Sequence, residues 1–318
     1  MTEFERARTV GRDSWFFAVA PALAQVPAEI LAEWERRHAL APDLHLYALV
    51  DRLLVPDIVE LCSAHGSPAP LSVYAGQPGY DSGRDWSPCL LLLSVDPDGL
   101  TQQVRTLVSD CSGIPALGFV TSRHAIDVIK AQLLRLTGIT DGQGKRWLLR
   151  FADTRVWPPA PGWLTAEQQA HAFAGIDAWM VVERHGDLQT LEGSPNATPA
   201  APGDMAKDFR VTERQLIHLI DCGEADMHLS RMAENPYHAQ LARTPIEQYD
   251  VVRQALATLD RLGIGEQQQR FVYARFAVRH AGDCEQDPAV QQALLAASRK
   301  EALLSDLLKA LRRRIPLP

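Results

Sequence analysis

The chain has 318 residues, of which 46% are hydrophobic and 22% charged, with a formal net charge of -7 and a mean hydropathy of -0.13. This composition is typical of a globular protein with an ample core, and the acidic balance argues against a general nucleic-acid binder. The basic sequence LRRRIPLP at the end of the chain leaves room for a local basic patch.

The N-terminal sequence MTEFERARTVGRDSWFFAVAPALA lacks the pattern of a secretory signal, because Glu3 and Glu5 precede the apolar run and Pro21 interrupts it. No segment approaches the roughly 20 apolar residues that a membrane span requires. The cysteines are odd in number and widely scattered, which disfavours a disulfide framework. We therefore expect a cytoplasmic protein that does not contact membranes.

Short strand-like runs alternate with amphipathic helices from residue 44 onward. The strand-like runs are LHLYALVD, LSVYA, CLLLLSV, ALGFVTS, RWLLRFA and IDAWMVVE. This alternation predicts an α/β domain over residues 44–188, with a mixed or largely parallel sheet flanked by helices. Residues 1–43 form an N-terminal extension to which the sequence assigns no structure.

The chain changes character after this domain. Residues 189–210 include TLEGSPNATPAAPGD, which has no apolar period and predicts a linker. Residues 211–318 predict an all-helical C-terminal lobe, because TERQ and TPIE fit the capping-box pattern and Pro288 opens a long leucine-rich helix.

Familiar catalytic and cofactor motifs are missing. The sequence has no G-x-S-x-G elbow, no Walker loop and no H-E-x-x-H, and GQGKRW lacks the third glycine of a dinucleotide fingerprint. The ten histidines never fall at the i, i+3 or i, i+4 spacing that places two ligands on one helix face. We therefore predict no catalytic residue, no bound cofactor and no metal site.

The stretch RWLLRFADTRVWPP, residues 146–159, carries the most distinctive cluster of charges. On a strand, Arg150 would lie at the end of the sheet, where Asp153 can bridge it or Arg155 through charge-assisted hydrogen bonds. One interpretation is an ion pair that fixes the turn; the other is a surface for a partner's carboxylates, with Trp157 as an anchor.

The last predicted helix offers a second candidate surface. Its leucines at helical spacing suit an apolar groove for a partner segment, or else pack within the lobe, since a helix must bury its apolar stripe. These residues are Leu303, Leu304, Leu307, Leu308 and Leu311.

Five segments, taken in chain order, resemble the effector-adaptor family of bacterial type VI secretion, whose members are called Tap or TEC proteins. The segments are LYALVD, SPCLLLL, GFVTS, LLRFADTRV and FAGIDAW. The resemblance covers residues 44–188 and extends to the helical tail. Its most specific piece is the core of Arg150, Phe151, Asp153 and Arg155. The chain departs from the family at Gln132 and Leu134, where members often have a histidine and an arginine, and at Thr154, often a proline; Arg135 is the candidate substitute for the missing cation.

The resemblance implies a non-enzymatic adaptor or chaperone. Such a protein binds a toxic effector in the cytoplasm and loads it onto the spike protein VgrG, and we expect a monomer within a ternary complex. Two other functions stay open: an immunity-type protein that binds a toxin, and a hydrolase with an unrecognised site near Asp153 or in the loop GYDSGRD.

Overall fold

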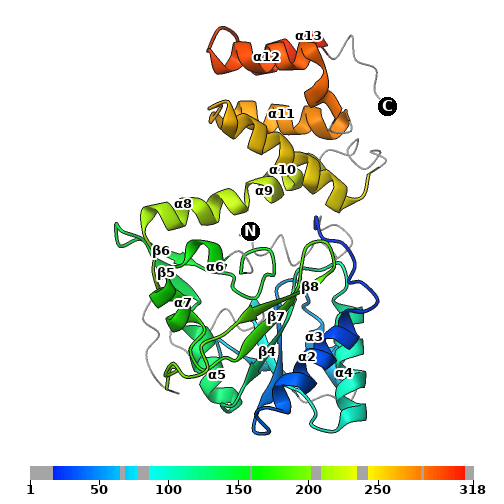
Figure 1. The fold of residues 1–318 in the computed structure, drawn as a ribbon, viewed down its shortest axis with the longest axis vertical. Helices are drawn as coiled ribbons and strands as arrows, with labels where there is room; N and C mark the ends of the chain where they lie inside the picture. Colours follow the sequence, from blue (N-terminus) through cyan, green and yellow to red (C-terminus); the bar gives the residue numbers. More distant parts are fainter. Residues whose placement is uncertain are drawn as a thin grey trace. The chain divides into compact units, whose positions relative to one another are not determined.

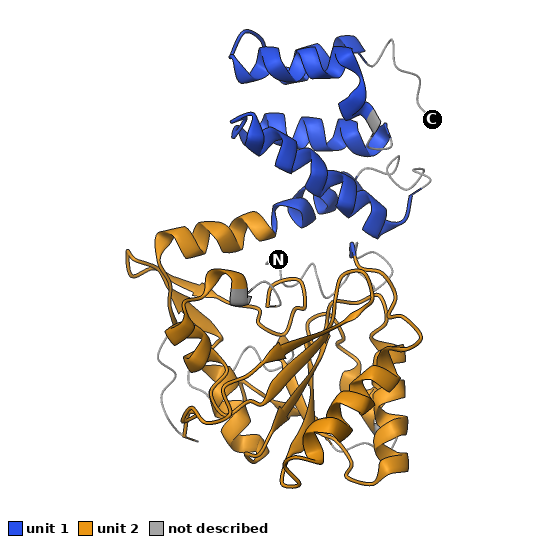
Figure 2. Ribbon diagram, in the orientation of Figure 1, with its two compact units in different colours: residues 1–18, 223–318 blue, residues 19–222 orange. Residues whose placement is uncertain are grey.

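The computed structural model describes residues 17–64, 69–76, 86–157, 160–201, 209–234, 243–280 and 283–311 (Figure 1). It divides into two compact units (Figure 2). The α/β unit consists of residues 19–222, and the helical unit consists of residues 1–18 together with 223–318.

A six-stranded sheet with the order β2-β3-β1-β4-β7-β8 forms the centre of the α/β unit. Its strands are β1 (His45–Val50), β2 (Leu71–Ser72), β3 (Cys89–Leu92), β4 (Leu117–Ser122), β7 (Ala178–Val182) and β8 (Leu188–Glu192). The expected fold class, α/β with a sheet flanked by helices, is confirmed. Every neighbouring pair in this sheet is antiparallel, so the alternative of a largely parallel sheet is wrong.

Two interleaved crossovers explain how helices and strands alternate in an antiparallel sheet. A helical crossover links strands that run in the same direction, and here each crossover skips one position. Helix α3 (Ile58–Ala64) links β1 to β2 past β3, and α4 (Pro97–Asp110) links β3 to β4 past β1. Each skipped strand runs the opposite way, so a pattern typical of parallel sheets gives antiparallel neighbours.

Helices cover both faces of the sheet (Figure 1). Helices α2 (Val26–His38), α3 and α4 lie on one face, and α5 (Ile126–Leu134) and α7 (Ala166–Ala172) on the other. Helix α4 begins at Asp96, whose carboxylate accepts a hydrogen bond from the Gly99 N–H, with Pro97 at the first helical position. The core under α5 includes Ile129 and Leu133, packed in one cluster with Trp179 of β7.

The α/β unit also contains a smaller sheet, made of β5 (Gly138–Thr140), β6 (Arg146–Leu148) and β9 (Phe209–Arg210). Helices α6 (Ala160–Trp163) and α8 (Glu213–Cys222) belong to the same unit. The strand expected over RWLLRFA is shorter than predicted, because the chain turns at Arg150, where the Asp153 N–H donates to the Arg150 carbonyl. Residues 189–192 of the expected linker belong to β8, where Leu191 is buried in the core. Because Gly193 and Pro195 follow these residues closely, the sequence pattern predicted a linker here and not a strand.

The helical unit contains five α-helices within the described ranges. They are α9 (Glu224–Ala233), α10 (Pro245–Arg261), α11 (Gln267–Arg279), α12 (Pro288–Ser298) and α13 (Leu304–Leu311), with a short 3-10 turn, η4 (Asp283–Gln286). The predicted capping box is present at α10, where Thr244 and Glu247 bond to each other's backbone N–H groups. A shared apolar core packs α10 and α11 together through Leu259 and Phe276. The expected helical region at the C-terminal end is confirmed.

Candidate functional site

The charged cluster of the sequence forms around the C-terminal end of β1. Asp51 follows this strand directly, and its N–H donates to the Ala116 carbonyl. The turn after β6 reaches the same place, because the Thr154 N–H donates to the carbonyl of Pro115 at 3.0 Å. A proline at position 154 could not donate this hydrogen bond, because proline has no backbone N–H. The threonine at this position, where the chain departs from the resembled family, therefore adds a hydrogen bond between the two segments.

Arg150 bridges two buried aspartates. Its Nη2 donates to Oδ2 of Asp51 at 2.7 Å, and its Nη1 lies 3.4 Å from Oδ2 of Asp153. Arg155 holds Asp153 more closely, with Nη2 2.7 Å from Oδ2 and with Nε and the backbone N–H each 3.0 Å from Oδ1. The side chains of Asp51 and Asp153 are 4% and 2% exposed, whereas that of Arg150 is 32% exposed. The cluster therefore buries its anions and keeps one cation partly in solvent.

The two aspartates have pKa values shifted in opposite directions. Burial raises the pKa of Asp51, because its loss of hydration outweighs the attraction of Arg150 and the hydrogen bond from the Leu53 N–H. Burial acts on Asp153 in the same sense, but the charge and hydrogen bonds of Arg155, together with the charge of Arg150, outweigh it and lower the pKa. Asp153 thus stays ionised, and both of its oxygens accept hydrogen bonds from Arg155, whereas a nucleophile or general base needs an oxygen directed at a substrate.

Trp157 lies in the core. Its side chain is buried, and its ring centroid is 5.5 Å from those of both Phe173 and Trp179. The sequence interpretation of Trp157 as an exposed anchor does not fit this position, because the ring has no free face to offer a partner. An aromatic residue next to charges gives no sequence signal that separates these two roles.

The candidate leucine groove is mostly filled by the helical unit itself. Leu304 and Leu308 are buried in its core, and Leu307 and Leu311 pack partly against it. Only Leu303 of the five is largely exposed. The stripe of α13 thus packs inside its own unit, as the alternative interpretation expects.

Gln132 fastens three segments of the α/β unit at one of the positions where the chain departs from the resembled family. Its amide donates to the carbonyls of His171 and Ala172 at 2.7 Å and 3.1 Å, and its Oε1 accepts from the Ala200 N–H at 3.0 Å. The side chain is fully buried and neutral. A glutamine here holds the end of α7 and a distant loop without any need for a cation.

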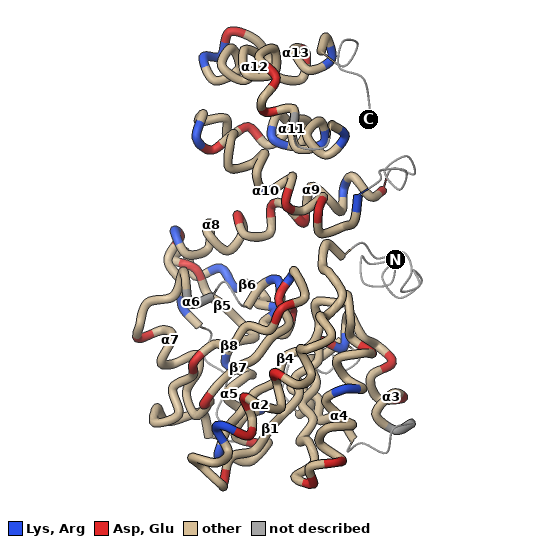
Figure 3. Tube along the Cα trace, turned by 45° about the vertical axis from the view of Figure 1, so that its right-hand side comes forward, with Lys and Arg blue, Asp and Glu red and all other residues tan. Residues whose placement is uncertain are grey.

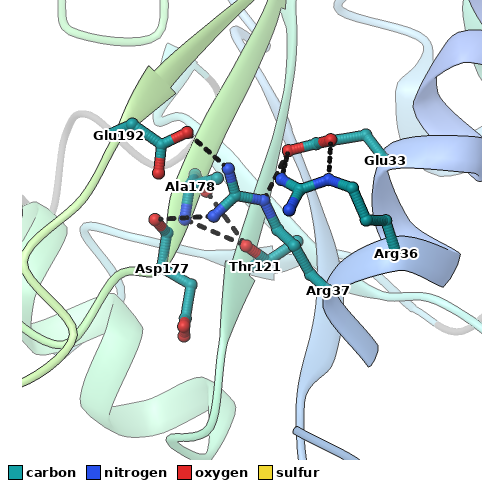
Figure 4. Close-up of polar contacts among 7 residues, drawn as sticks. All are labelled: Glu33, Arg36, Arg37, Thr121, Asp177, Ala178 and Glu192. Carbon is teal, nitrogen blue, oxygen red and sulfur yellow. Dashed lines mark hydrogen bonds and ion pairs between the residues drawn. The ribbon is translucent and has the colours of Figure 1, made fainter. Parts of the chain in front are cut away.

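A second polar cluster, which the sequence reasoning missed, ties α2 to the sheet (Figure 4). Arg37 donates to Glu33 on its own helix at 2.6 Å, to Glu192 of β8 at 2.6 Å and to the Asp177 carbonyl at 3.3 Å. Arg36 pairs with the same Glu33 at 2.7 Å. The i, i+4 spacing of Glu33 and Arg37 is a recognisable sequence signal, but nothing local points to Glu192.

Charges along α2 also suit the helix dipole (Figure 3). Glu29 lies in the first turn, and Arg36 and Arg37 lie in the last. Together with the contacts to β8, this arrangement makes α2 an integral part of the α/β unit. The N-terminal extension expected over residues 1–43 therefore includes a structured helix, while residues 1–16 lie outside the described residues.

Two further properties concern metals and membranes. Within the described ranges, no three His, Cys, Asp or Glu side chains come together where they could hold a metal ion. Among the helices of the described chain, none has both the length and the apolar character to cross a membrane.

One comparison with known proteins gives a match. Residues 46–171 match the model of a family described as a domain of unknown function (DUF4123). The match begins in β1 and ends in α7, so it contains the whole cluster from Asp51 to Arg155 but neither α2, β8 nor the helical unit. No curated protein and no solved structure matches the chain.

Proposed function

We propose that the protein is a non-enzymatic adaptor, or chaperone, that binds a type VI secretion effector in the cytoplasm and loads it onto the VgrG spike. The observation that carries the proposal is the family match over residues 46–171, because this domain is known in type VI secretion effector adaptors. The match coincides with the region in which the sequence resembles those adaptors.

The geometry of the charged cluster supports a binding role. Two buried aspartates fix the guanidinium of Arg150, so little side-chain entropy is left to lose when a partner binds it. Its Nε has no hydrogen bond within the described chain, and the side chain is partly exposed. A preorganised arginine at a surface suits recognition of a partner's carboxylate.

The proposal is tested by co-purification of the full chain with the toxin and the VgrG protein encoded by neighbouring genes. We expect a single complex that contains all three proteins, with a mass by light scattering that fits one copy of the adaptor. A chain that binds the toxin alone and neutralises it would instead be an immunity-type protein. A chain that binds neither protein would overturn the proposal, and a screen for hydrolysis would follow.

Arg150→Gln tests the role of the cluster within this function. We expect at least tenfold weaker binding of one partner, because the cation that meets its carboxylate is lost. Arg36→Ala is the matched control, since it removes an exposed arginine that contacts Glu33 on its own helix. Circular dichroism and thermal melting of both variants show whether the loss of binding reflects unfolding.

A further inference from the structure

Strand β8 forms one edge of the six-stranded sheet, and no strand of the described chain pairs with its outer side. Two hydrogen bonds fix its register with β7, one from the Glu183 N–H to the Asp187 carbonyl and one from the Gly193 N–H to the Asp177 carbonyl. Backbone groups of an antiparallel strand point alternately to its two sides. The residues whose N–H and C=O point away from β7 are Leu188, Thr190 and Glu192. Within the described ranges, none of these backbone groups makes a hydrogen bond.

Within the described residues, β8 carries few of the devices that usually protect an edge strand. The opposite edge, β2, has only two residues, whereas β8 has five and contains neither proline nor lysine. Its one charged side chain, Glu192, is drawn toward α2 by Arg37 (Figure 4). The outer backbone groups of β8 are therefore available for pairing with another strand. Arg37 partly neutralises the charge of Glu192, which would otherwise hinder that pairing.

The geometry points to β8 as the docking edge for an extended segment of a protein partner, which adds to the sheet as a seventh strand. This inference rests on the adaptor function proposed above and names the surface and the form of partner segment it would use. Three outward residues supply three N–H and three C=O groups. Backbone pairing of this kind gives affinity, and the side chains beside the edge give specificity.

Charge complementarity defines the segment that fits. The Glu192 side chain is 74% exposed, and Arg37 contacts only its Oε1, which leaves Oε2 without a hydrogen bond in the described chain. Leu188, four residues before Glu192 and with its side chain on the same face of the sheet, is half-buried. A segment with a basic residue opposite Glu192 and an apolar residue opposite Leu188 complements this edge.

A second copy of the chain fits less well. In a symmetric antiparallel pair centred on Thr190, Leu188 of each copy lies opposite Glu192 of the other. That arrangement sets an apolar side chain against a carboxylate twice. A different protein, with its own sequence, avoids this mismatch.

Proline at position 190 tests the edge directly. Thr190→Pro removes an N–H that bonds nothing within the sheet and directs the proline ring toward the incoming strand, so the hydrogen bonds to β7 remain. We expect at least tenfold weaker binding of the effector or of VgrG, each titrated separately by calorimetry. The control Thr190→Val keeps the N–H and should bind within twofold of the unchanged protein. Thermal melting verifies that both variants fold.

Amide hydrogen exchange provides a readout that needs no substitution. In the free protein, the amides of Leu188, Thr190 and Glu192 should exchange quickly, and those of Gln189 and Leu191, which face β7, slowly. On complex formation we expect at least tenfold slower exchange at the three outward amides and little change at the other two.

The outcomes separate this inference from the adaptor function. If the complex forms while the outward amides stay unprotected and Thr190→Pro binds normally, the edge inference is overturned and the adaptor function stands. If the unchanged protein binds neither partner, both are overturned. Protection of these amides that rises with protein concentration alone identifies a second copy as the occupant and also overturns the inference.

Discussion

Arg150 in the α/β unit and Arg270 in the helical unit are each shared by two acidic side chains, but the two clusters differ in which charges they bury. In the α/β unit, Asp51 and Asp153 are buried and Arg150 is partly exposed. In the helical unit, Arg270 is only 10% exposed, and one of its partners, Asp260, is 64% exposed. The first cluster buries two anions around an accessible cation, and the second buries the cation together with Glu224, whose side chain is 13% exposed.

The helical cluster connects three helices. Arg270 of α11 forms two hydrogen bonds with Glu224 of α9, one of them 2.6 Å from Nε to Oε1, and a third with Asp260 of α10. His228 lies 3.2 Å from Glu224 and is buried. Burial acts to raise the pKa of Glu224, but the hydrogen bonds and charges of Arg270 and His228 together outweigh it and lower the pKa, while the contact with Glu224 raises the pKa of Arg270.

The comparison shows two ways in which acidic side chains can surround an arginine. An arginine that is itself buried and fully engaged holds helices together and has little left for a partner. An arginine that is anchored by buried carboxylates but reaches solvent is fixed in place and still accessible. This difference is why we propose a binding role for Arg150 and a structural role for Arg270.

The largest expected effect comes from Arg150→Ala, which leaves two buried carboxylates without their shared cation. We expect the free energy of unfolding to fall by about 3–5 kcal/mol, as when one partner of a buried ion pair is removed. Urea unfolding of the full chain measures this loss. A decrease below about 1 kcal/mol would contradict the view that the cluster stabilises the end of β1.

Arg270→Met should have a smaller effect, because Glu224 keeps the neighbouring His228. We expect a loss of about 1–3 kcal/mol, typical of a partly buried group left without its partner. The double variant Arg270→Met with Glu224→Met should recover most of this loss, because apolar groups of similar size often replace a buried ion pair without cost. No recovery in a double-mutant cycle would mean that the pair itself stabilises the helices.

Asp51 and Glu224, one from each cluster, should contribute to stability with opposite dependence on pH. Asp51 has a raised pKa, so it contributes stability below its unfolded pKa, and this is lost as pH rises through the folded pKa. Glu224 has a lowered pKa, so its contribution is present above the unfolded pKa and is lost as pH falls through the folded pKa. Asp51→Asn should thus gain stability relative to the unchanged protein as pH rises from about 4. Glu224→Gln should lose the most stability, relative to the unchanged protein, near neutral pH. Urea unfolding at several pH values measures both, and parallel curves would refute the contrast.

The smallest expected effect is that of Asp260→Asn, which changes the exposed partner of Arg270. Exposed ion pairs contribute little, so we expect less than about 1 kcal/mol. Thermal unfolding of this variant beside the unchanged protein measures the loss. A loss above about 2 kcal/mol would show that Arg270 depends on both acids equally.

Sequence patterns predicted the features that local residues determine. The alternation of strands and helices gave the α/β class, and the capping box at Thr244 gave the start of α10. The second predicted box, at Thr212, is also present, with its hydroxyl accepting from the Gln215 N–H. The short spacing of Arg150, Asp153 and Arg155 indicated their ion pairs correctly.

Features set by distant contacts could not be predicted. Strand direction leaves no trace in an apolar run that is covered on both faces, so the antiparallel order was missed. Asp51 contacts Arg150 across 99 residues, and Arg37 contacts Glu192 across 155. The burial of an aromatic residue such as Trp157 could not be predicted from its neighbours in the sequence, because burial depends on the whole fold.

The interleaved crossovers have a consequence for synthesis of the chain. Strand β1 lies between β3 and β4, so it stays incomplete until both have left the ribosome. At about 5–20 residues per second, the 99 residues between Asp51 and Arg150 take roughly 5–20 s to add. The Asp51 carboxyl group has no partner throughout that interval, and strand β1 lacks its neighbours β3 and β4 for the first part of it. We therefore expect the α/β unit to fold in one late, cooperative step, with its first half the part of the nascent chain most prone to aggregation.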